Sequence, residues 1–127
     1  MAEAFATRHH AAPGVAFTSA GTTTPGGWAV TPSTVTVMRA VGIDIAGHVS
    51  RPLSDVMARD PDIIYVMTGP QLDHVIGAYT DLSGRVEMLD PGGIDIADPY
   101  GHDLDAYVEA CRAIEAAVAA RATEWLG

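Results

Sequence analysis

The chain has 127 residues, a mass of 13.2 kDa and a formal net charge of -9, from 16 acidic and 7 basic side chains. This excess of carboxylates argues against a nucleic-acid binder, which needs a basic face to displace the counterions of phosphates, and against docking on an anionic membrane surface. With 48% apolar and 18% charged residues, the sequence is too apolar for a disordered chain. Its length suits one domain, residues 1–127.

The sequence shows no pattern typical of a targeting signal, and it has too few cysteines for a disulfide. No apolar run approaches the roughly 20 residues of a membrane-spanning helix, and the first ten residues lack the basic start and apolar centre of a signal peptide. Cys111 is the only cysteine, which excludes an internal disulfide and a cysteine-built zinc site. We therefore expect a cytoplasmic protein.

The first third of the chain predicts two helices and one strand. Strong helix formers fill residues 1–10, and residues 15–18, Val-Ala-Phe-Thr, predict a short strand. A turn-rich segment follows over residues 19–32, with Pro25-Gly26-Gly27 at its centre. Residues 33–40 then predict a helix with Ser33 as its N-cap.

The rest of the chain alternates between strands and helices. Residues 62–67 are almost continuously apolar, which is typical of a strand covered on both faces. Pro70 opens a predicted helix, residues 85–89 predict a strand nearer an edge, and residues 90–101 predict a loop. A long helix over residues 103–126 has one apolar face, formed by Leu104, Tyr107, Val108, Cys111, Ile114, Val118 and Trp125. This alternation predicts an α/β fold with a parallel sheet layered by helices.

Four motifs in this order resemble a known family. They are Ser19-Ala20-Gly21-Thr22 with Trp28 behind it, Gly42-Ile43-Asp44 leading to His48-Val49-Ser50-Arg51, the run over residues 62–68 with His74 after it, and Asp95-Ile96-Ala97-Asp98-Pro99-Tyr100-Gly101 before a final helix that contains Tyr107. Together they resemble the low-molecular-weight protein tyrosine phosphatases, a superfamily that includes arsenate reductases and protein-arginine phosphatases. The resemblance implies a three-layer α/β/α fold with a short parallel sheet.

The resemblance also implies that part of the family's pattern is absent. Family members begin with a buried strand and a phosphate-binding Cys-x5-Arg-Ser-Pro loop, followed by a helix whose start resembles Met1-Ala2-Glu3-Ala4-Phe5. We therefore expect the first strand, the loop and the nucleophile to be missing, either because the sequence starts at an internal methionine or because the loop was lost. The family's strand order, 2-1-3-4, makes the missing strand the central one. We accordingly expect a homo-oligomer or a strand-donating partner.

Several residues match functional positions of the family. Asp98 matches the general acid, Ser19 and His48 match residues that support the phosphate loop, and Trp28 and Tyr100 match the mouth of the pocket. Thr31 and the run Thr34-Val35-Thr36-Val37 depart from the family pattern. The sequence therefore does not determine the shape of this wall of the pocket.

Each match has a plainer alternative. Asp98 is also a common type of turn residue, and Asp95 is better explained as a solvated loop carboxylate. Trp28 and Tyr100 are equally well explained as exposed aromatic side chains without a role. For Ser19 and His48 we expect hydrogen bonds to each other, to a backbone group or to water.

Nothing in the sequence supplies a nucleophile, a metal site or a cofactor site. Position 117, six residues after Cys111, is alanine where a phosphate loop would have arginine, and Cys111 lies on the apolar helix face. We expect it to be a buried, inert side chain. The five histidines, His9, His10, His48, His74 and His102, form no metal-binding motif.

The leading functional hypothesis is a phosphatase-family domain that is catalytically incomplete. The complete family hydrolyses phosphomonoesters such as phosphotyrosine or phosphoarginine, so a small or phosphorylated ligand is expected. Three alternatives stay open: a repurposed small-molecule enzyme that uses Asp98, His48 and Tyr100, a non-catalytic binding or scaffold protein, and an arsenate reductase relative, which the single cysteine disfavours. Whether the chain is an enzyme is therefore open at this point.

Overall fold

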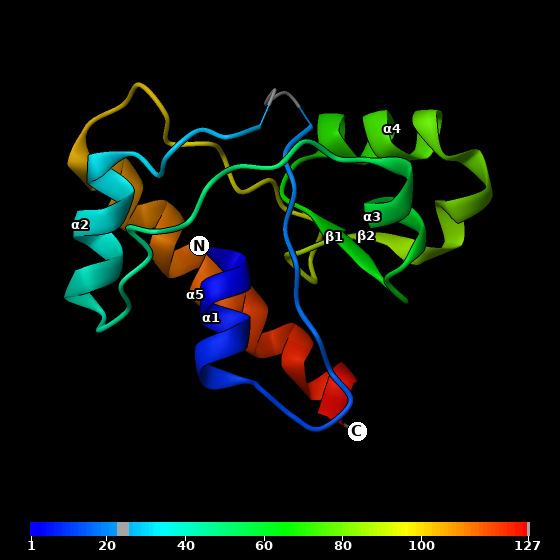
Figure 1. Cartoon of the computed structure of the whole chain (residues 1–127), viewed down its shortest axis with the longest axis horizontal. Coiled ribbons are helices and arrows are strands. Elements are labelled where there is room, and N and C mark those ends of the chain that lie inside the picture. The colour runs from blue at the N-terminus through cyan, green and yellow to red at the C-terminus, as the bar shows by residue number, and fades with distance from the viewer. Residues whose placement is uncertain (23–25, 127) are drawn as a thin grey trace.

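The computed structural model describes residues 1–22 and 26–126, and Figure 1 shows the arrangement of its elements. In chain order they are α1 (Ala2–His9), α2 (Pro32–Ala40), α3 (Asp55–Arg59), β1 (Ile64–Val66), α4 (Gly69–Ala78), the 3₁₀ helix η1 (Thr80–Arg85), β2 (Val86–Met88) and α5 (Leu104–Leu126).

The two strands form a short parallel sheet that lies between two layers of helices. Ile64 pairs with Val86 and Val66 with Met88, and α4 and η1 make the crossover from β1 to β2. Helix α4 packs on this sheet, whereas α1 and α2 pack on α5. The long α5 helix, orange to red in Figure 1, runs along the other side of the molecule from α4. The predicted α/β fold with a parallel sheet is confirmed.

Alternate residues of β1 enter two different hydrophobic clusters. Ile64 and Val66 join a cluster under α3 and α4 that includes Val75 and Leu82, while Tyr65 and Met67 pack against the larger cluster around α5. Both faces of the strand are therefore covered, which explains why residues 62–67 are almost continuously apolar.

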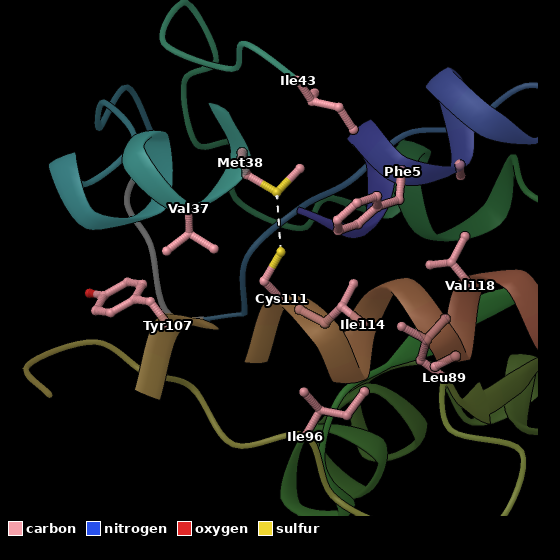
Figure 2. Close-up of a cluster of buried hydrophobic side chains, with 12 residues drawn as sticks. Phe5, Val37, Met38, Ile43, Leu89, Ile96, Tyr107, Cys111, Ile114 and Val118 are labelled. Atoms are coloured by element: carbon pink, nitrogen blue, oxygen red, sulfur yellow. Dashed lines mark hydrogen bonds between the residues drawn. The ribbon is translucent and has the colours of Figure 1, made fainter. Parts of the chain in front are cut away.

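The larger cluster joins α1, α2 and α5 (Figure 2). Phe5 of α1 and Met38 of α2 are almost completely buried against Ile114 and Val118 of α5. Ile114 and Val118 belong to the apolar face that the sequence predicts for the final helix.

Arg121 ties the last turns of α5 to the end of β2. Its side chain is only 8% exposed, Nη2 donates to the carbonyl of Met88 at 2.6 Å and Nε donates to that of Leu89 at 3.1 Å. The guanidinium also lies 5.1 Å from the ring centre of Tyr65 and pairs with Glu124. Each of the three guanidinium nitrogens of this buried side chain thus donates a hydrogen bond, as the burial of a charge requires.

The structure corrects several sequence predictions. Residues 15–18 are extended but belong to no strand, because no described segment pairs with them. The N-cap of helix α2 is Thr31, two residues before the predicted N-cap Ser33, and the helix begins at Pro32, which agrees with the preference of proline for a first helical position. Leu104 of the predicted apolar face is 48% exposed, because it lies at the first residue of α5.

One further difference concerns a segment without a strong pattern. The five-residue α3 was not predicted, and only its N-cap, Ser54, whose Oγ accepts from the Met57 N–H, is a local signal for it. Gly26 and Gly27 of the predicted turn do have positive φ angles, whereas Pro25 lies outside the described residues.

Candidate functional site

Glu3, in the first turn of α1, is the centre of a small polar cluster. Its Oε2 accepts a hydrogen bond from the Ser19 hydroxyl at 2.7 Å and lies 3.7 Å from Nδ1 of His48. Its Oε1 lies 3.6 Å from Nη2 of Arg51. The expected contact between Ser19 and His48 is therefore indirect, because the Glu3 carboxylate lies between them.

A surface hollow of about 550 Å³ opens beside this cluster. Glu3, Arg8, Asp44 and His48 are among the residues that line it, together with Thr7. Charges of both signs therefore border the hollow, next to the apolar side chains of Ala4 and Ile45.

Asp98 lies on the loop between β2 and α5, the segment for which the sequence predicts a loop. Its Oδ1 accepts the Tyr100 N–H at 3.0 Å, an Asx turn that fixes the carboxylate on an exposed loop. Asp95 differs, because its Oδ1 accepts the Gly69 N–H at 2.9 Å and so connects the loop to the start of α4. Both carboxylates border a second hollow of about 270 Å³ that α5 closes on one side. When it is protonated, an exposed, oriented carboxyl group of this kind can donate a proton to a leaving group, and that role stays a prediction.

Trp28 and Tyr100 are both exposed aromatic side chains, at 62% and 72% of their surface. The backbone of Trp28 is fixed by two hydrogen bonds, since its N–H donates to the Ser50 hydroxyl and its carbonyl accepts the Ser50 N–H. Within residues 1–22 and 26–126, no ring contact joins Trp28 to Tyr100. The structure thus brings Ser19 and His48 together at Glu3 and joins the backbone of Trp28 to Ser50, between His48 and Arg51, while Asp98 and Tyr100 share another loop.

Cys111 is buried in the larger hydrophobic cluster, with 3% of its surface exposed. Its Sγ faces Sδ of Met38 at 3.9 Å (Figure 2). Burial raises the pKa of the thiol above its ordinary value, and the nearby Glu115 carboxylate raises it further. The predicted burial of Cys111 is confirmed, and its surroundings suppress the thiolate form that nucleophilic chemistry needs.

We expect iodoacetamide at pH 8 to alkylate Cys111 about tenfold or more slowly in the folded chain than in urea, because both burial and the raised pKa of the thiol oppose reaction. Mass spectrometry of the labelled chain measures both rates without ambiguity, since Cys111 is the only thiol. Equal rates in the two conditions would contradict the burial of this side chain.

No metal or membrane signal accompanies these residues. The described part of the chain contains no group of three or more His, Cys, Asp or Glu side chains arranged to hold a metal ion. In the same residues, no helix combines the length and the apolar character needed to cross a membrane.

Sequence reasoning missed two residues of the polar cluster, Glu3 and Arg51. Glu3 was noticed only as part of a helix start, and a carboxylate in the first turn of a helix is usually explained by the helix dipole. Arg51 stands at the end of one of the recognised motifs, three residues after His48, and that spacing was the available signal.

Comparison with known proteins gives consistent matches over nearly the whole chain. The family model described as low molecular weight phosphotyrosine protein phosphatase matches residues 1–125. A probable low molecular weight protein-tyrosine-phosphatase, EpsP of Ralstonia nicotianae, is 36% identical over 107 residues, which are 84% of this chain and 74% of that protein.

Solved structures share the fold. The YwlE arginine phosphatase from Geobacillus stearothermophilus superposes with a TM-score of 0.91 at 24% identity, over 98% of this chain and 82% of that one. Vibrio vulnificus Wzb, solved in complex with benzylphosphonate, gives a TM-score of 0.89 at 22% identity, over 97% of this chain and 87% of the other. At these identities the structures establish the arrangement of the elements.

Proposed function

Because the chain belongs to the low molecular weight phosphotyrosine protein phosphatase family, we propose that residues 1–127 form a phosphatase domain that keeps the acid loop but lacks a nucleophile. Asp98 is the general acid of this proposal, and Trp28 and Tyr100 border the substrate. Ser19 and His48, joined through Glu3, belong to the support of the phosphate-binding loop.

The single observation that carries the proposal is the position of the only thiol. Phosphoryl transfer to cysteine needs an accessible thiolate close to groups that hold the phosphate oxygens. Cys111 faces Met38 in the core instead, and residues 1–127 contain no Cys-x5-Arg sequence. Asp98 has no nucleophile to assist within these residues.

For the complete catalytic unit, with a strand and a Cys-x5-Arg-Ser-Pro loop joined before Met1, we propose hydrolysis of phosphotyrosine. The relative that is 36% identical is named a probable protein-tyrosine-phosphatase, whereas the arginine phosphatase is 24% identical. The aromatic side chains of Trp28 and Tyr100, both exposed, also favour an aromatic leaving group, because aromatic rings stack.

We expect the 127-residue chain to hydrolyse p-nitrophenyl phosphate no faster than a buffer control, because it has no thiolate positioned to attack phosphorus. Release of p-nitrophenol measures the rate, and circular dichroism verifies that the assayed chain is folded. The extended chain, with the added strand and loop, serves as the positive control and is expected to turn over.

Two results would contradict this proposal. Vanadate-sensitive turnover by the 127-residue chain that disappears in the variant Cys111→Ser would show that Cys111 is a nucleophile. A folded but inactive extended chain would show instead that the acid loop and the support residues do not serve phosphoryl transfer.

A further inference from the structure

The loop between β2 and α5, residues 89–103, contains four aspartates, and each of their carboxylates accepts a hydrogen bond from the backbone. In three of them the donor lies two to four residues further along the chain: Asp90 with Gly92 and Ile94, Asp98 with Tyr100, and Asp103 with Ala106. Asp95 is the exception, because its Oδ1 accepts the N–H of Gly69, which is 26 residues away and opens α4. Its carboxylate therefore holds two distant segments together, whereas the other three carboxylates shape their own turns.

The bond from Asp95 completes the start of α4. The N–H groups in the first turn of a helix have no partner within the helix. The Gln71 N–H donates to the Thr68 hydroxyl, and Pro70 has no N–H. The Gly69 N–H is the remaining donor of this turn, and Asp95 supplies its acceptor at 2.9 Å. The positive end of the helix dipole further favours a carboxylate at this position.

A second hydrogen bond, from the next residue, docks the same part of the loop. The Ile96 N–H donates to the Met67 carbonyl at 2.8 Å, and the Ile96 side chain is buried in the larger hydrophobic cluster. Asp98 follows Ile96 by two residues, so their Cα atoms lie at most about 7 Å apart. The position of the Asp98 carboxyl group therefore depends on how firmly residues 95 and 96 are held.

We propose that Asp95 is a positioning residue for the general acid: its bond to the Gly69 N–H holds the loop so that the Asp98 carboxyl group reaches the leaving oxygen of the substrate. The inference rests on the proposed function. In that reaction the thiolate of the added loop forms a bond to phosphorus, the bond from phosphorus to the leaving oxygen breaks, and the proton of Asp98 moves to that oxygen. Asp95 acts through Asp98 and takes no part in the proton transfer.

The variants Asp95→Ala and Asp95→Asn separate the hydrogen bond from the charge. Alanine removes the acceptor of the Gly69 N–H, whereas asparagine keeps a side-chain oxygen that can accept it. In the folded 127-residue chain, we expect the Gly69 and Ile96 amide hydrogens to exchange about fivefold or more faster in Asp95→Ala than in Asp95→Asn or the unchanged chain, because the two bonds hold one segment. NMR measures these rates without any catalytic activity.

The activity test uses the extended chain, with the added strand and Cys-x5-Arg-Ser-Pro loop, and two substrates that differ in their leaving group. Phenol is a weaker acid than p-nitrophenol, so its departure from phosphorus depends more strongly on the general acid. We expect Asp95→Ala to lower kcat/KM about tenfold or more for p-nitrophenyl phosphate and about a further threefold or more for phenyl phosphate. Asp95→Asn is expected to keep both values within a few-fold of those of the extended chain.

Asp103→Ala is the matched control. It removes a bond of the same kind from the same loop, but at the start of α5. A loss that only reflects a less stable chain lowers both rates by one factor, so we expect the ratio of the two kcat/KM values to stay unchanged in this control. In the Asp98→Asn background, Asp95→Ala should cause no further loss, since the group that it positions no longer carries a proton.

Several results would overturn the inference while the proposed function stands. In an extended chain that Asp98→Asn impairs, Asp95 is not a positioning residue if Asp95→Ala keeps full activity, lowers both rates by the same factor, or adds a further loss to Asp98→Asn. Unchanged exchange of the Gly69 amide in Asp95→Ala would likewise exclude this bond as the connection. An extended chain that is inactive, or indifferent to Asp98→Asn, would overturn the proposed function and this inference with it.

Discussion

In the extended chain that carries the added strand and Cys-x5-Arg-Ser-Pro loop, Asp98→Asn should lower kcat for p-nitrophenyl phosphate by roughly 10²–10⁴-fold, the usual contribution of general acid catalysis. Asparagine keeps the side-chain oxygen that accepts the Tyr100 N–H, so the turn is preserved while the proton donor is lost. The measured loss therefore reports chemistry rather than a change of the loop.

Asp95→Asn is the matched control for this prediction. Asp95 is an exposed carboxylate of the same loop, and asparagine keeps its bond to the Gly69 N–H. We expect this variant to retain activity within a few-fold, since its carboxylate is not the proposed acid. If the two variants behave alike, or if Asp98→Asn has no effect, the assignment of the acid is wrong.

The variant Ile114→Ala should lower the free energy of unfolding of the 127-residue chain by roughly 2–5 kcal/mol, the range found for removing a large aliphatic side chain from a core. Ile114 is 5% exposed and lies in the middle of the cluster that joins α1, α2 and α5. The truncation leaves a cavity that these three helices cannot fill without moving. Urea denaturation followed by circular dichroism measures the loss.

Leu104→Ala serves as the control on the same helix. Leu104 is half exposed at the first residue of α5, so its truncation should cost less than about 1 kcal/mol. A loss below about 0.5 kcal/mol for Ile114→Ala, the range of ordinary surface substitutions, would contradict the docking of α5 described above.

The sequence was most informative where one periodicity extends over many residues. The face of α5 that contains Tyr107, Cys111, Ile114 and Val118 is buried as predicted, because four or more turns of a 3.6-residue repeat leave little ambiguity. Trp125 on the same face is only partly buried, since it lies near the end of the helix, where it contacts the rings of Phe17 and Tyr65. The periodicity of a sequence specifies which face of a helix is apolar, but it does not specify how much of that face other elements bury.

The candidate site was less predictable because its geometry is made by contacts between distant segments. The residues Ser19, His48, Trp28, Tyr100 and Asp98 were identified by resemblance, yet nothing local indicates that Ser19 and His48 meet through Glu3. The same limit applies to residues 15–18, whose pattern is that of a strand. Such a pattern becomes a strand only where a second segment pairs with it. The local sequence carries no information about that second segment.

The division of the core into two clusters has a consequence for the order of folding. The cluster of Ala58, Val66, Val75, Leu82 and Val86 is formed within a single stretch of the chain, whereas the larger cluster brings Phe5 and Met38 to Ile114 and Val118 from opposite ends. Closing the longer loops costs more entropy before any contact is gained. We expect the middle of the chain to be structured in the folding transition state and the two ends to dock afterwards, so that φ-values are higher at Val75 than at Phe5.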